Sequence, residues 1–144
     1  MERLDFASVM AVLRRNIPDE NFGNQADFLD SLFLDMGFSP QTAMEFDQGQ
    51  VCRWINGLAR LSPNIISFYQ DSFNQRKLVS RIKNMLLPMM PDSAMAAQEL
   101  YDLVLQAPNV SPQKKMELTD GYNFEDENDE AIFIMEILCL EIGR

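Results

Sequence analysis

Three Ser-Pro pairs place the strongest constraint on how this chain folds: Ser39-Pro40, Ser62-Pro63 and Ser111-Pro112. A serine cap followed by proline at the first helical position is typical of a helix start. Apolar residues then recur at three- and four-residue steps, and no segment shows the sustained two-residue alternation of a half-buried strand. The sequence therefore predicts an all-α fold, a compact domain of about seven to nine short helices.

Local signals define where these helices begin and end. Residues 21–24 break the pattern before the second helix, and Gly37 is expected to cap its end. Asn74 is expected to cap a later helix, and Asp92 or Ser93 the one after it. The helices are expected over 3–14, 28–36, 40–46, 47–57, 63–73, 74–87 and 93–106, from 112 onward, and after Glu130.

The chain is expected to form one domain over 1–144, because 144 residues with 47% hydrophobic side chains are enough for a core. The segment Pro88-Met89-Met90-Pro91 is expected to be extended, since residues before proline avoid the helical region. It is also the candidate boundary of a subdivision at 88–91. No apolar run has the length of a signal peptide or a membrane span, which predicts a cytoplasmic protein without membrane contact.

The chain contains no histidine, which removes most enzyme templates. Without His there is no Ser-His-Asp or Cys-His pair and no imidazole metal ligand. The six glycines are isolated, so no phosphate-binding loop is present. We therefore expect no catalytic residues, no cofactor and no metal.

Charge is distributed unevenly along the chain, whose formal net charge is −10. Residues 53–83 hold six cations against one acid, a net charge of +5, whereas 91–144 hold twelve acids against three cations. A solvated helix face explains such runs without any partner, but two opposed faces also suit a protein partner or head-to-tail self-association. The expected interaction residues are Arg76, Lys77, Arg81, Met89, Met90, Glu125, Asp126, Glu127, Asp129 and Glu130.

The ten methionines include Met89 and Met90 beside the proline break. Methionine fills irregular cores and also builds adaptable binding surfaces. Core packing is the first expectation for this pair; if exposed, it would form an apolar patch that a partner covers.

Residues 39–69 resemble a phage-repressor-like helix-turn-helix. In that resemblance Val51 is the buried residue of the recognition helix, Trp54 the core aromatic and Gly57 the cap. It implies DNA contact by Gln48, Gln50, Arg53 and Arg60. The match departs in the turn, where Ala43 stands about two residues too far from Val51 for the motif. The alternative is that Val51 and Trp54 are core residues of an ordinary capped helix.

A second resemblance covers most of the chain from Phe28 onward. Its landmarks are 46–47, 49–57, Ser62-Pro63, 74–76, 87–90 and 92–96. They are similar to the helical N-terminal regions of Firmicutes signalling proteins, in which such a module precedes a STAND-type, NB-ARC-like ATPase. The resemblance implies an adaptor or effector module of bacterial or phage conflict systems, and no catalytic residues carry over.

Three functional hypotheses follow. The first is a non-enzymatic, acidic protein-interaction module with an adaptor or regulatory role. The second is a helix-turn-helix transcription regulator that binds DNA. The third is an acidic nucleic-acid mimic that inhibits a nuclease or defence complex, for which the acids of 117–141 would form one continuous surface.

Overall fold

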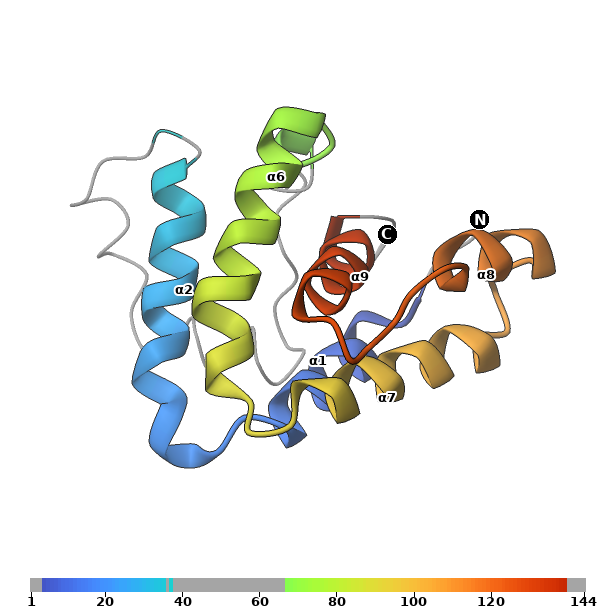
Figure 1. Ribbon diagram of the computed structural model, residues 1–144, viewed down its shortest axis with the longest axis horizontal. Coiled ribbons are helices and arrows are strands. Elements are labelled where there is room, and N and C mark those ends of the chain that lie inside the picture. Colours follow the sequence, from blue (N-terminus) through green and yellow to red (C-terminus); the bar gives the residue numbers. More distant parts are fainter. Residues whose placement is uncertain (1–3, 36, 38–66, 140–144) are drawn as a thin grey trace.

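The computed structural model describes residues 4–35, 37 and 67–139, which contain six α-helices and no strand (Figure 1). This confirms the all-α prediction for that part of the chain. The expected helices at 40–46 and 47–57 lie outside the described residues, as do residues 63–66 of the helix expected at 63–73. The α-helices are α1 (Phe6–Arg15), α2 (Phe22–Asp35), α6 (Ser72–Arg81), α7 (Ser93–Gln106), α8 (Pro112–Thr119) and α9 (Glu127–Cys139).

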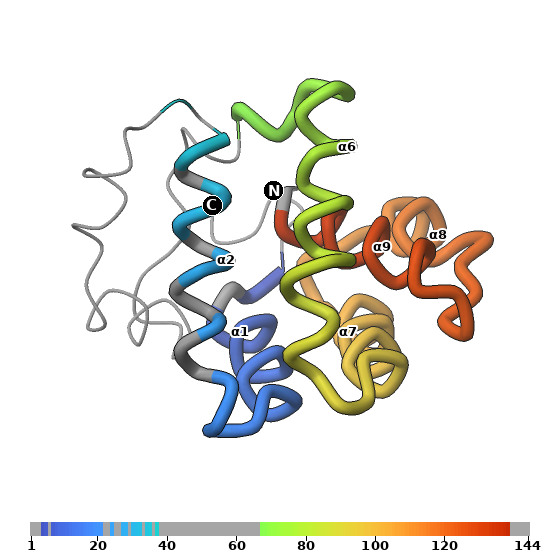
Figure 2. Tube along the Cα trace, turned by 60° about the vertical axis from the view of Figure 1, so that its left-hand side comes forward, coloured from blue at the N-terminus to red at the C-terminus, as the bar shows by residue number. Residues whose placement is uncertain are grey.

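The helices pack one against the next and do not form a parallel bundle. Helix α2 runs beside α6, α9 crosses α6, and α7 lies between α1 and α9 (Figures 1 and 2). Helix α8 contacts α7 and α9 at the far end from α2. The elements before and after 88–91 thus pack on one another, and their buried residues belong to one hydrophobic cluster.

Short polar side chains cap the helices. Ser111 accepts a hydrogen bond from the Lys114 N–H at 3.2 Å, with Pro112 at the first helical position, as expected. Asp92 caps α7 by accepting from the Met95 N–H at 3.0 Å. Gly37, at φ +86°, adopts the left-handed conformation expected after α2.

Two helix starts differ from the sequence-based expectation. Helix α2 begins at Phe22 and includes Gly23, although glycine costs about 1 kcal/mol in a helix; burial of Phe28 on the same helix outweighs that cost. The cap of α6 is Asp71 rather than Asn74, because the Asp71 carboxylate accepts from the N–H groups of Phe73 and Asn74.

The sequence predicts an extended segment over 88–91, but Pro88 and Met89 are helical. Residues Ile82–Leu86 form a π-turn, in which the Leu87 N–H donates to the Ile82 carbonyl, and a 3₁₀ turn follows over Leu87–Met89. Pro88 has no N–H to continue the ordinary ladder, which favours this wider turn. The expectation holds at Met90, which is extended before Pro91.

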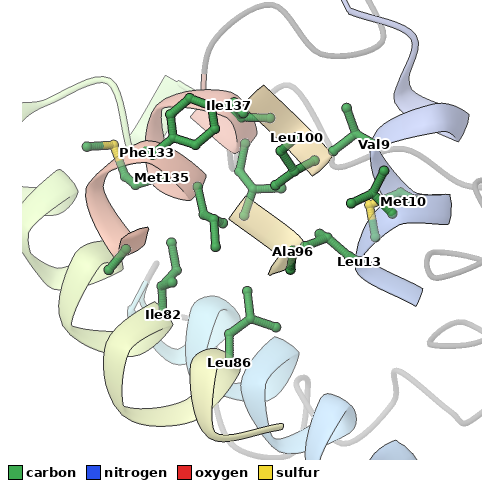
Figure 3. Packing of buried hydrophobic residues seen from close by; sticks show 14 of the residues in the cluster. Val9, Met10, Leu13, Ile82, Leu86, Ala96, Leu100, Phe133, Met135 and Ile137 are labelled. Atoms are coloured by element: carbon green, nitrogen blue, oxygen red, sulfur yellow. The ribbon is translucent and has the colours of Figure 1, made fainter. Parts of the chain in front are cut away.

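The core forms where α1, α6, α7 and α9 meet (Figure 3). Ala96 and Leu100 of α7 face Val9 and Leu13 of α1, and α9 supplies Phe133 on the other side. None of the helices within the described ranges is long and apolar enough to cross a membrane.

Replacing Leu100 by alanine is expected to lower the free energy of unfolding by about 2–5 kcal/mol, because the side chain is fully buried and its loss leaves a cavity. Leu105→Ala on the same helix is the matched control. Its side chain is 45% exposed, so a change within about 0.5 kcal/mol is expected. Urea denaturation followed by circular dichroism measures both, and equal losses would contradict the described packing of α7.

Candidate functional site

A pocket of about 430 Å³ lies in the angle between α6 and α9. Its residues repeat at helical steps of three and four on each helix, so one face of each forms a wall. The floor is apolar because Val79 and Ile132 are half-buried and Met135 is buried. We call this pocket the α6–α9 notch; it is lined by Ser72, Gln75, Arg76, Val79, Asn128, Ile132 and Met135.

An exposed aromatic ring stands on α6 beside the notch. The Phe73 side chain is 56% exposed, and it follows Ser72 directly in the chain. The Lys77 ammonium lies 4.9 Å and the Arg76 guanidinium 5.8 Å from the centre of the ring. Cations over a ring face at an exposed site contribute about 0.5–1 kcal/mol. Phe73, Arg76 and Lys77 together form what we call the basic edge of the notch.

The cations of the basic edge have no acidic partner in the described part of the chain, where no carboxylate lies within 4.0 Å of Arg76 or Lys77. Arg81, one turn further along, differs from them. Its guanidinium pairs with Asp35 of α2 at 3.3 Å, and Asp35 is mostly buried. Of the three basic residues predicted to interact, Arg76 and Lys77 are therefore available at the surface, whereas Arg81 joins α2 to α6 through its ion pair.

The chain enters α9 through three acidic residues. Glu125, Asp126 and Glu127 are exposed, and Asn128, which lines the notch, follows them directly. Asp126 also has a structural role, because its carboxylate accepts from the Asn128 N–H at 2.8 Å. We call Glu125, Asp126 and Glu127 the acidic segment.

The other two predicted acids are held inside the fold. The Asp129 carboxylate accepts from the Asn123 N–H at 3.0 Å and is half-buried. Glu130 is 3% exposed and accepts from the Ser93 hydroxyl at 2.9 Å, which corrects its expected place on the interaction surface. Packing of α9 against α7 covers it, so Glu130 does not belong to an exposed acidic surface.

Met89 and Met90, also expected at an interaction surface, are buried. Their side chains are only 2% and 4% exposed, and the Met89 carbonyl accepts from the Asn21 side chain at 2.9 Å. The 3₁₀ turn that follows the π-turn directs this part of the chain into the core. The condition for a methionine patch is therefore not met, and the pair fills the core.

The four residues expected to contact DNA lie outside the described residues. The helix-turn-helix hypothesis rests on them, so it stays a prediction. They are Gln48, Gln50, Arg53 and Arg60.

Among the described residues, three titratable groups have raised pKa values, and they lie on separate elements. Burial raises the pKa of Glu130, as do Glu127, Asp92 and Asp126 around it, whereas the Ser93 hydroxyl acts in the opposite direction. Burial and the hydrogen bond to Glu136 raise the pKa of Tyr122, and burial and Asp27 raise that of Asp30. No hydrogen bond joins any two of the three groups. Nor does any cluster of three metal-binding side chains occur in the ranges that the structure describes.

Sequence reasoning did not identify the notch, although one local signal was present. Phe73 is followed by Arg76 and Lys77 at steps of three and four, the spacing at which helical side chains meet. Expecting the cap at Asn74 placed Phe73 on the preceding helix and hid that relation. The far wall of the notch comes from α9, more than fifty residues later in the sequence, and no local pattern links the two.

Comparison of the chain with protein-family models, with curated protein sequences and with solved structures gave no match. Neither resemblance stated for the sequence is tested by this result.

The raised pKa of Glu130 predicts how stability depends on pH. Because the folded state holds this proton more tightly than the unfolded chain, unfolding releases it. The Glu130 contribution to the free energy of unfolding therefore falls as pH rises from about 4.5 through the folded-state pKa. Glu130→Gln removes this titration and retains a partner for Ser93, so its stability relative to the wild type should increase between pH 5 and pH 8.

Urea denaturation at several pH values tests the Glu130 prediction. The control is Glu125→Gln, an exposed carboxylate of the same acidic segment, whose stability relative to the wild type should not vary in this way. The prediction is wrong if both variants show the same pH dependence.

Proposed function

We propose that this chain is a non-enzymatic protein-interaction module that binds its partner at the α6–α9 notch. One observation carries the proposal: a large aromatic side chain is exposed beside a pocket with an apolar floor, and over its ring lie two cations that no described carboxylate neutralises. Aromatic residues and arginine that become buried at the centre of an interface are the residues that dominate its binding energy.

The composition of the notch favours binding over catalysis. Its polar lining consists of Ser72, Gln75, Arg76 and Asn128, and none of the groups with a raised pKa lines it. Acid-base chemistry needs titratable groups whose environments separate their pKa values. The notch offers a concave shape and apolar surface instead, and these are the properties of a recognition site.

The charges around the notch favour a protein partner over nucleic acid. Affinity for phosphates grows with the number of cations at the contact surface. Here one residue of the pocket lining, Asn128, directly follows three exposed acids in the chain, Glu125, Asp126 and Glu127. The surroundings of the pocket are therefore of mixed charge, and a protein surface can present both signs of charge.

The setting of the interaction rests on the resemblance to the N-terminal regions of STAND-type ATPases alone. An adaptor or regulatory role in the cytoplasm of a bacterium, in a host or phage conflict system, is the setting that this resemblance favours.

Capture of partners from a bacterial lysate tests the proposed function. The test variant combines Phe73→Ser, Arg76→Glu and Lys77→Glu. Helix α8 offers a control away from the notch, since Lys114 and Lys115 are cations and Met116 is an exposed apolar side chain, and none of them lines the notch. Lys114 pairs with Glu117 and Lys115 donates to the Leu105 carbonyl, so this variant also loses two local contacts. The tagged wild type and the control (Lys114→Glu, Lys115→Glu, Met116→Ser) are expected to retain a protein partner after nuclease treatment, and the test variant to lose it.

Two results of this capture experiment contradict the proposal. One is recovery of nucleic acid, with every captured protein lost after nuclease treatment. The other is capture that the notch variant retains as well as the control does. Circular dichroism spectra of both variants establish that each is folded.

A further inference from the structure

The exposed cations of α6 and of the turn after it are not balanced by acids. Residues 72–90 contain four basic residues and no acidic residue. Arg81 is paired with a carboxylate of α2. The other three, Arg76, Lys77 and Lys83, are exposed and have no carboxylate within 4.0 Å in the described part of the chain. This side of α6 is therefore open to an acidic group from outside the chain.

Two of these cations surround a single ring. The Lys77 ammonium lies 4.9 Å and the Arg76 guanidinium 5.8 Å from the centre of the Phe73 ring. Their fields add near that ring, so a carboxylate placed there is attracted by both. Arginine also presents parallel N–H donors that match the two oxygens of a carboxylate. The basic edge is thus complementary to an Asp or Glu side chain.

Arg76 connects these cations to the apolar notch, because its side chain is part of the lining. The other polar residues of the lining are uncharged, and two of them, Gln75 and Asn128, carry amide groups. A side-chain amide both donates and accepts hydrogen bonds, which is what the N–H and C=O groups of a peptide require. The notch therefore suits an apolar side chain together with the peptide backbone that carries it.

The length of the notch limits how far apart the two recognised groups can be. Its lining residues run from Ser72 to Val79 on α6 and from Asn128 to Met135 on α9. Each wall is therefore about two turns, or about 10 Å, long. An extended chain covers that length with about three residues. A segment that fills the notch and reaches Arg76 needs its apolar and its acidic residue within about two positions of one another.

We propose that the α6–α9 notch binds a linear segment of another protein, in which a large apolar side chain enters the notch and a neighbouring Asp or Glu pairs with the basic edge. The inference rests on the proposed function and names the chemistry of its partner. Phosphate groups would satisfy the cations alone, whereas this segment also covers the apolar floor. Because the contact is small, the expected dissociation constant is above about 1 µM.

Selection of random dodecapeptides displayed on phage, with the full chain as bait, tests this inference. Phage that bind the Phe73→Ser, Arg76→Glu, Lys77→Glu variant are removed first, so that peptides specific to the notch remain. The enriched peptides should carry an Asp or Glu within about two positions of a large apolar residue, more often than the unselected peptides do.

Fluorescence anisotropy of the most enriched peptide, synthesised with a dye, measures the ion pair. Arg76→Glu should weaken binding by about fivefold or more, because it replaces an attraction with a repulsion. The matched control is Lys83→Glu, which reverses another exposed, unpaired cation of the same stretch that does not line the notch. It should bind within about twofold of the wild type.

A charge-swapped peptide separates direct pairing from damage to the fold. When its acidic residue is replaced by Lys, the peptide should bind the Arg76→Glu variant more tightly than it binds the wild type. Such a reversal of preference requires a folded notch and contact between the two charges.

The inference is overturned if no peptide is enriched, if the enriched peptides lack the acidic residue, or if Arg76→Glu and Lys83→Glu weaken binding equally. It is also overturned if dye-labelled poly(dT) of about 20 nucleotides binds the wild type more tightly than the peptide does, because phosphate is then the ligand of the cations. The capture experiment decides the proposed function separately. A protein partner that the notch variant loses there leaves that function standing, and only the chemistry assigned to the partner is wrong.

Discussion

The close contact of α7 with two helices at once determines how the rest of the described chain is arranged. Ala96 and Ala97 are fully buried, and such small side chains let neighbouring backbones approach closely. With α1 on one side and α9 on the other, α7 orients α9 so that it crosses α6 (Figure 2). Two crossed helices diverge on either side of their contact. The α6–α9 notch lies in one of these angles, so its shape follows from the packing of α7.

The cations of one helix have two different roles. Arg81 pairs with Asp35, whose carboxylate also accepts from the Tyr69 hydroxyl at 3.5 Å, so this pair joins α6, α2 and the segment before α6. Arg76 and Lys77, about one turn earlier, lie over Phe73 and point away from the core. Replacement of Arg81 would therefore affect the fold, whereas Arg76 and Lys77 are exposed and hold no other helix. Counting cations along the sequence does not distinguish these roles.

Features that depend on neighbouring residues were predictable from the sequence. The caps Ser111 and Asp92 and the glycine after α2 are examples, since each needs only a few adjacent residues. Features that depend on distant contacts were not. Glu130 is buried because Ser93, 37 residues earlier, lies against it. The burial of Met89 likewise depends on core residues from other helices, and the notch needs walls from α6 and α9. The residues expected to bind DNA lie outside the described part of the chain, so their prediction is neither confirmed nor corrected.

The π-turn at Ile82–Leu86 has a consequence for how this region tolerates changes in length. A π-turn holds one residue more than an α-turn, and here it brings Leu87 under Ile82, so that both enter the core. An insertion or deletion elsewhere in α6 would rotate every later side chain by about 100° and take the buried face out of register. Removal of one residue from the π-turn instead restores an ordinary α-turn, with the helical faces on either side kept aligned. Length variants of this protein should therefore be tolerated at 82–86 and not within α6.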